Sequence, residues 1–232
     1  MGKDVIVACD FSDRKTCLDF LSLFTERKPF VKIGMELYYA EGPEIVRTIK
    51  NLGHRIFLDL KLHDIPNTVE KAMAVLSSLG VDMCNVQAAG GRAMMEAALR
   101  GLRQGGGERP KLIAVTQLTS TSQACLEAEL LIEKPMGQVV KHYAENARAA
   151  GLDGVVCSPL EAAYVKEACG ASFLTVTPGV RFPREDADDQ VRITTPEGAR
   201  ILGSDYIVVG RPITGAPDPV SAYLRCIKEF EG

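Results

Sequence analysis

Residues 57–69 read FLDLKLHDIPNTV, an apolar run that ends in closely spaced charges and then a proline. The apolar start predicts a buried β-strand. Pro66-Asn67-Thr68 predicts the first turn of a helix, because proline is tolerated at the first helical position. Asp59 and Lys61 are two positions apart, so on a strand they point to the same face. The stretch therefore predicts a strand-to-helix unit whose junction carries a charged site.

The same strand-to-helix order recurs along the whole chain. Eight short apolar runs are predicted strands: 5–7, 30–33, 56–60, 83–87, 112–117, 154–157, 173–176 and 206–209. Predicted helices occupy 13–27, 42–52, 66–79, 91–103, 136–150, 159–168, 196–202 and 218–230. Runs that are apolar on both faces indicate a parallel sheet covered by helices.

Eight such units in 232 residues favour a closed barrel over an open doubly wound sheet. An open sheet most often shows a nucleotide site, G-x-G-x-x-G, after its first strand. CDFSDR at 9–14 lacks that pattern, and no linker or shift in composition marks a second domain. We therefore expect an α/β fold, a single (β/α)8 TIM barrel over residues 1–232. Its active site is expected at the C-terminal ends of the strands.

Composition narrows the classes of function. The net charge is −3 with both signs interspersed, which gives no electrostatic argument for a nucleic-acid or membrane partner. No apolar run reaches about 18 residues, and the N-terminal segment turns acidic too soon for a signal peptide. Seven scattered cysteines without a C-x-x-C pair indicate reduced, buried thiols. We expect a cytoplasmic protein with no metal site.

Polar and charged residues collect at the predicted C-terminal ends of the strands. Buried charge at a barrel rim is costly unless it is paired or functional. Asp10 and Lys32 alone are equally well explained as a structural ion pair, but a structural role does not explain the further charges at the same mouth. The collected residues are Asp10, Lys32, Asp59, Lys61, Gln87, 117–120, Ser158, Thr177, Pro178, Gly210 and Arg211.

Asp59 and Asp64 flank Lys61 in the sequence, and opposite charges nearby favour the charged form of a lysine. At about 4 Å and an effective dielectric of about 20, each contact is worth roughly 4 kcal/mol before desolvation. The trio predicts a fixed ammonium group that acts as a proton source. A surface salt-bridge cluster is the remaining alternative. We expect His63 to point away from Asp59 and Lys61, as a packing or surface residue.

The other side of the mouth predicts phosphate binding. Gly210 and Arg211 directly follow the last strand, where such barrels frequently bind phosphate. Two long connections, 118–135 and 178–195, are candidate lids, and Arg181 and Gln190 of the second could close over the phosphate. The residues thus predict an enzyme acting on a small phosphorylated substrate by acid–base or carbanion chemistry.

DLKLHDIPNTV closely resembles the signature of the orotidine 5'-monophosphate decarboxylase family. The Asp-x-Lys-x-x-Asp core marks a wider group with sugar-phosphate decarboxylases and aldolases, and the Ile-Pro-Asn-Thr continuation narrows the resemblance. The likeness extends over essentially the whole chain, through ACDFSD, VKIG, QLTSTS, TPGVR and VVGRPI.

This resemblance implies decarboxylation of orotidine 5'-monophosphate to uridine 5'-monophosphate and CO2, the last step of de novo UMP synthesis, without metal or cofactor. It implies a homodimer with shared active sites. Asp10, Asp59 and Lys61 would come from one subunit, and Asp64 and Thr68 from the other. Lys61 would protonate C6 of the pyrimidine, with Asp59 beside the departing carboxylate.

The resemblance also implies the substrate-binding residues. Asp10 and Lys32, with Asp64 of the other subunit, would hold ribose hydroxyls, and Thr119 and Ser120 would meet the pyrimidine edge. The residues implied at the phosphate and base ends are Pro178, Arg181, Gln190, Gly210 and Arg211.

Two other functions remain as alternatives. One is a magnesium-dependent sugar-phosphate decarboxylase or aldolase of the same superfamily, which shares the Asp-x-Lys-x-x-Asp core. The other is a non-catalytic barrel that senses pyrimidine nucleotides. Loss of Asp59 or Lys61 would mark such a sensor, and the sequence retains both.

Overall fold

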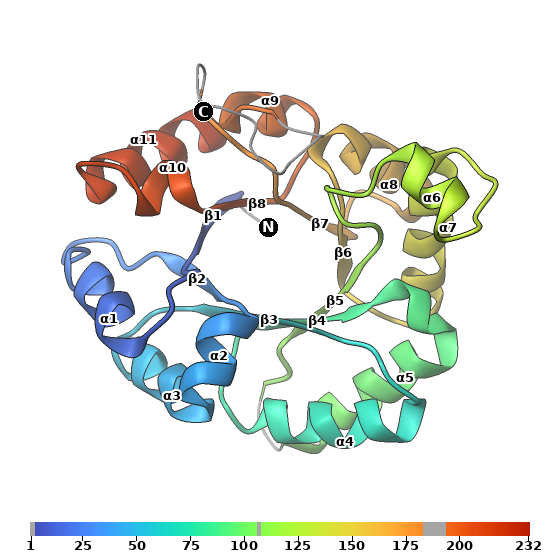
Figure 1. Ribbon diagram of the computed structural model, residues 1–232, viewed down its shortest axis with the longest axis horizontal. Coiled ribbons are helices and arrows are strands. Elements are labelled where there is room, and N and C mark those ends of the chain that lie inside the picture. The colour runs from blue at the N-terminus through green and yellow to red at the C-terminus, as the bar shows by residue number, and fades with distance from the viewer. Residues whose placement is uncertain (1–2, 106–107, 183–193) are drawn as a thin grey trace.

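The computed structural model describes residues 3–105, 108–182 and 194–232. Within them, eight parallel strands form a closed barrel in chain order, and helices surround the ring (Figure 1). The predicted (β/α)8 barrel is confirmed. The strands are β1 (Asp4–Ala8), β2 (Phe30–Ile33), β3 (Ile56–Leu62), β4 (Met83–Gln87), β5 (Lys111–Val115), β6 (Gly154–Val156), β7 (Leu174–Thr177) and β8 (Tyr206–Val209).

The helices follow the predicted order with three additions, α2, α6 and α10. The 118–135 connection, expected to be a loop, contains α6, and α1 ends five residues earlier than predicted. No helix of the described residues is long and apolar enough to cross a membrane. The helices are α1 (Arg14–Ser22), α2 (Met35–Glu41), α3 (Pro43–Asn51), α4 (Pro66–Ser77), α5 (Gly91–Leu102), α6 (Gln123–Ala128), α7 (Met136–Ala149), α8 (Ala162–Cys169), α9 (Pro196–Ile201), α10 (Arg211–Thr214) and α11 (Pro219–Glu231).

Two apolar layers hold the barrel together. Side chains alternate along each strand, so Val5 and Val7 pack in the layer between strands and helices. Ile6 belongs to a second cluster that fills the barrel interior, where the rings of Phe30 and Tyr206 meet edge to face at 6.1 Å. The interior is therefore a packed core that leaves room for a site only at its mouth.

The N-terminal ends of three strands repeat one arrangement, a glycine at positive φ two residues before an aspartate. Each aspartate accepts a backbone N–H of the preceding strand and pairs with a cation, so its charge is neutralised where the strand begins. We call Asp82, Asp153 and Asp205 the G-x-D aspartates. The three sets are Asp82 with Lys50 and the Ile56 N–H, Asp153 with Arg109 and the Leu112 N–H, and Asp205 with Lys166 and the Thr175 N–H.

Candidate active site

A cavity of about 480 Å³ lies where the strands end, at the opposite end of the barrel from the G-x-D aspartates. Its volume is typical of sites for small molecules. Ten residues to which the sequence analysis assigns a catalytic or binding role line this cavity, as do Gln117 and Leu118. The ten are Asp10, Lys32, Asp59, Lys61, Thr119, Ser120, Pro178, Arg181, Gly210 and Arg211.

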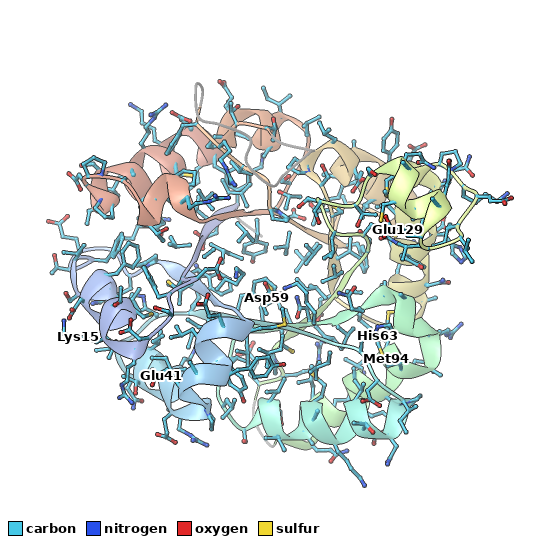
Figure 2. All side chains as sticks on the ribbon, viewed as in Figure 1. Lys15, Glu41, Asp59, His63, Met94 and Glu129 are labelled. Carbon is cyan, nitrogen blue, oxygen red and sulfur yellow. The ribbon has the colours of Figure 1, made fainter. Side chains whose placement is uncertain are left out.

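Four of these side chains, Asp10, Lys32, Asp59 and Lys61, form a chain of alternating charge that we call the charged array. Lys32 Nζ lies 2.7 Å from Asp10 Oδ1 and 3.5 Å from Asp59 Oδ2. Lys61 Nζ lies 2.7 Å from Asp59 Oδ1. Figure 2 shows Asp59 inside the ring of strands. Because β2 and β3 are neighbours in the barrel, Lys32 and Asp59 meet side by side at the inner wall.

Burial and charge act in opposite directions on the two least exposed members. The Lys32 and Asp59 side chains are each 11% exposed. Burial alone would raise the pKa of Asp59, but the two lysines and hydrogen bonds from Lys61 and Asn85 hold it below its ordinary value. Burial alone would lower the pKa of Lys32, but Asp59 and Asp10 raise it. Both groups are therefore charged at neutral pH.

The backbone at Lys61 is unusual. Its φ is 51°, in the left-handed region that residues other than glycine seldom adopt. The pairing of β3 with β4 is irregular at this point, because Leu58 pairs with Cys84 and Leu62 with Val86. Three residues of β3 thus face a single residue of β4, and Lys61 sits in the resulting bulge.

Asn85 is the single residue of β4 opposite this bulge. Its Oδ1 accepts the backbone N–H of Lys61 at 2.8 Å, and its Nδ2 donates to Asp59 Oδ1 at 2.7 Å. Asn85 is 1% exposed. The sequence reasoning missed Asn85, because MCNVQ has the pattern of a buried strand; the available signal was a second amide, in the middle of the strand that ends in Gln87.

His63 lies away from the charged array, as expected. The residue is exposed and lies outside the ring of strands, near Met94 (Figure 2). Strict alternation would put residues 59, 61 and 63 on one face of the strand. The left-handed residue at Lys61 breaks that alternation, and β3 ends at Leu62, so the His63 ring packs beside Gly90.

Asp64 and Thr68 do not line the cavity of their own chain. Both are exposed, and Asp64 Oδ1 accepts the N–H of the next residue, Ile65, at 2.7 Å. Within one chain, Lys61 therefore has Asp59 beside it, and Asp64 does not complete the predicted cage. The expectation that Asp64 and Thr68 reach a neighbouring subunit's site stays a prediction.

The long connection after β7 begins at the cavity, and its two ends are hydrogen-bonded to each other. The Arg181 N–H donates to the Thr194 carbonyl at 2.9 Å, and the Thr194 N–H donates to the Gly179 carbonyl at 3.0 Å. These two bonds close the base of the connection beside the buried Arg181 side chain. Gln190, predicted to close over the phosphate, lies outside the described residues.

Arg211 and Gly210 line the same cavity at the start of α10. Thr214, one turn further along α10, also lines it, and the sequence reasoning missed this residue because α10 is too short to show a helical pattern. The cavity thus joins the charged array to a basic group after β8. Such a site can bind an anionic small molecule and place an ammonium beside it.

Comparisons with known proteins agree over the whole chain. The sequence profile of the "Orotidine 5'-phosphate decarboxylase / HUMPS family" matches residues 3–226. The chain is 58% identical to "Orotidine 5'-phosphate decarboxylase" of Bacillus caldolyticus, over 100% of this chain and 96% of that protein. It is 57% identical to the protein of that name from Geobacillus thermodenitrificans, over 100% of this chain and 98% of the relative.

A solved structure has the same fold. The crystal structure of "Orotidine 5'-phosphate decarboxylase from Lactobacillus acidophilus" superposes with a TM-score of 0.90 at 43% sequence identity. The match covers 99% of this chain and 100% of that one. Barrel and sequence therefore resemble the same group of proteins.

Proposed function

We infer that this chain, which belongs to the orotidine 5'-phosphate decarboxylase / HUMPS family, is a carboxy-lyase that converts orotidine 5'-monophosphate to uridine 5'-monophosphate and CO2. The activity belongs to pyrimidine biosynthesis. The observation in the structure that carries this inference is the position of Lys61. Its ammonium group is held 2.7 Å from Asp59 in the wall of a substrate-sized cavity that also contains Arg211.

Decarboxylation at C6 requires a positive charge and a proton donor near that carbon, and Lys61 supplies both. When the bond between C6 and the carboxylate breaks, its electron pair stays on C6 and CO2 leaves. The pyrimidine offers that carbon no conventional electron sink, so a nearby positive charge must stabilise it. The Lys61 ammonium provides this charge and then transfers a proton from Nζ to C6, and the neutral amine regains a proton from water.

The rest of the charged array holds the Lys61 ammonium in place. Asp59 fixes Lys61 from one side and is itself held by Lys32, whose second partner is Asp10. Because these contacts are made by the protein's own side chains, little reorganisation is needed when charge develops on C6. Asp10 and Lys32, at the mouth, are proposed to bind the ribose hydroxyls.

The remaining cavity residues are proposed to bind the two ends of the nucleotide. Arg211 and the backbone of Gly210 bind the phosphate, and Gln190 would add a contact from the long connection. Thr119 and Ser120 meet the pyrimidine edge, and Pro178 and Arg181 line the base and phosphate ends. Phosphate binding far from C6 supplies energy that can order the site around the reacting carbon.

The simplest test is the loss of the ultraviolet absorbance of orotidine 5'-monophosphate on adding the purified protein in the presence of a chelator. We expect turnover without added metal or cofactor. Strict dependence on magnesium would instead favour a sugar-phosphate decarboxylase or aldolase. Binding of the nucleotide without turnover would favour a sensor. Among the described residues, no group of three or more His, Cys, Asp or Glu side chains could hold a metal ion.

We also propose a homodimer in which each active site takes Asp64 and Thr68 from the partner subunit. Residues 63–68 form an unbroken exposed run, in which Ile65 is 67% exposed. On α2, which follows β2 at the same end of the barrel, Tyr39 is 68% exposed and Met35 is 45% exposed. Exposed apolar side chains at the same end of the barrel as the cavity favour burial against a second copy.

Subunit mixing tests this arrangement. Asp59→Ala and Asp64→Ala subunits, each inactive alone, should recover about a quarter of wild-type activity after exchange, because half of the dimers are hybrids with one intact site each. As a matched control, Asp59→Ala mixed with Lys61→Ala should recover none, since both changes affect residues of the same subunit's share. No recovery in the first mixture, despite proven exchange, would refute the shared site.

We propose a cytoplasmic location for the enzyme. The described residues include all seven cysteines; they form no disulfide, and six of them are buried. Proteins kept in a reducing compartment retain their thiols in this form. Fractionation of cells that express the protein would test the assignment.

A further inference from the structure

The bulge at Lys61 leaves backbone groups that the strand ladder cannot pair. Between the pairs Leu58–Cys84 and Leu62–Val86, three residues of β3 face one residue of β4. Lys61 turns into the left-handed region there, with φ of 51°. A conformation of this kind costs of order 1–3 kcal/mol and persists only where surrounding groups hold it. Some neighbouring group must therefore hold Lys61 in this left-handed conformation.

The Asn85 side chain fills the gap in the ladder. Its Oδ1 takes the Lys61 N–H at 2.8 Å, which the bulge has removed from regular pairing with β4. Its Nδ2 donates at 2.7 Å to Asp59 Oδ1, the same oxygen that receives the Lys61 ammonium. One buried amide thus contacts the Lys61 backbone directly and also contacts the carboxylate that pairs with the Lys61 ammonium.

The orientation of this amide is fixed by its two partners. An N–H must face an acceptor and a carboxylate must face a donor, so a flipped amide would meet both with the wrong group. No aliphatic residue makes either bond, and an aspartate would place a second carboxylate against Asp59. Asparagine therefore fits here through both halves of its side chain.

We propose that Asn85 is a positioning residue of the active site, which fixes the Lys61 ammonium by holding both the left-handed Lys61 backbone and the Asp59 carboxylate. The hydrogen bonds of Asn85 with the Lys61 backbone and Asp59 support the positioning role by themselves. Its kinetic consequence rests on the proposed decarboxylase function. Asn85 does not line the cavity, so it acts through Lys61 and Asp59 rather than on substrate.

Two variants separate positioning from a general loss of stability. Asn85→Leu keeps similar volume without either bond, and Asn85→Ala removes the side chain. In both, kcat for orotidine 5'-monophosphate should fall on the order of 10- to 100-fold, because a shift of about 1 Å in a reacting group has this effect. The dissociation constant of uridine 5'-monophosphate should stay within about threefold, since the phosphate contacts at Arg211 are untouched.

Thr175→Val is the matched control. Thr175 is also fully buried on a strand, and its hydroxyl donates to Asp205 at the other end of the barrel. This variant should lower the melting temperature and leave kcat within about twofold of wild type. A kcat loss in Thr175→Val as large as that in the Asn85 variants would show that any buried polar loss has this effect, and would overturn the proposal.

A crystal structure of Asn85→Leu tests the geometry without reference to activity. Lys61 should leave the left-handed region, and the separation of its Nζ from Asp59 should exceed the present 2.7 Å. Unchanged Lys61 geometry, or an unchanged kcat in an active enzyme, would overturn the proposal. A wild-type chain that does not decarboxylate orotidine 5'-monophosphate would refute the proposed function instead, and the crystal structure would still decide the role of Asn85.

Discussion

Replacing Lys61 with alanine should abolish turnover and leave the barrel folded. A unit charge about 4 Å from C6, at an effective dielectric of about 20, stabilises the developing carbanion by about 4 kcal/mol. That energy corresponds to about a thousandfold in rate. Loss of the general acid adds about 10²- to 10⁴-fold. Together these effects predict a fall in kcat of about 10⁵- to 10⁷-fold.

The same structure predicts little damage to stability. Removing one partner of a buried ion pair is costly when the other charge is left alone. Here Asp59 keeps the Asn85 amide at 2.7 Å and the Lys32 ammonium at 3.5 Å. The Lys61 side chain is itself 26% exposed. We therefore expect the free energy of unfolding to change by no more than about 1–2 kcal/mol.

The assay combines three measurements on Lys61→Ala: decrease of substrate absorbance, calorimetric binding of uridine 5'-monophosphate, and thermal unfolding. Lys15→Ala is the control, because Lys15 is 86% exposed at the rim of the molecule and pairs with Asp19 in the next turn of the helix (Figure 2). It should behave as wild type. A folded Lys61→Ala enzyme with kcat within tenfold of wild type would refute the reasoning.

Three other perturbations test separate parts of the structure. Arg211→Ala should raise KM by about 10- to 100-fold, as expected for one charge-assisted bond to phosphate, in steady-state kinetics. Gly154→Ala should lower the free energy of unfolding by about 1–3 kcal/mol in urea titrations, because its Cβ would lie 2.3 Å from the Leu174 carbonyl oxygen. The pKa values of Asp59 and Asp153 are lowered on folding, against burial, by their cationic and hydrogen-bonding partners. Their contribution to stability is therefore fully present above the ordinary pKa of 3.8 and lost as the pH falls through the folded pKa. In thermal unfolding at a series of acid pH values, the melting temperature of Asp153→Asn should fall less steeply with decreasing pH than that of wild type.

Much of the barrel could be predicted because its strands carry their own signal. The segments 30–33, 83–87 and 206–209 match the observed strands residue for residue. The errors concern elements that local pattern cannot reveal. Helices α6 and α10 have six and four residues, too few to show a 3.6-residue period. The predicted helix at 13–27 ends at Ser22, where the chain turns toward β2.

Prediction of the site succeeded where topology alone brings residues together. The C-terminal ends of parallel strands meet at one mouth, so Asp10 and Lys32 could be placed beside Asp59 without knowing any contact. Asn85 could not be found in this way, because its role depends on the register between β3 and β4. The pairing of these strands is interrupted by a bulge at Lys61, and the local sequence DLKL does not predict that this lysine adopts a positive φ.

The two ends of the barrel use buried charge for different purposes. Each G-x-D aspartate pairs with one cation and also accepts a strand N–H, so its carboxylate completes the backbone structure where a strand begins. In the charged array, the Asp59 carboxylate instead accepts hydrogen bonds from two side chains, the Lys61 ammonium and the Asn85 amide. The G-x-D aspartates therefore contribute to the backbone hydrogen bonding of the barrel, whereas Asp59 positions other side chains and can take part in the reaction. The desolvation cost of burying the Asp59 carboxylate is offset locally by Lys32, Lys61 and Asn85. The barrel can therefore hold a preorganised ammonium at its mouth.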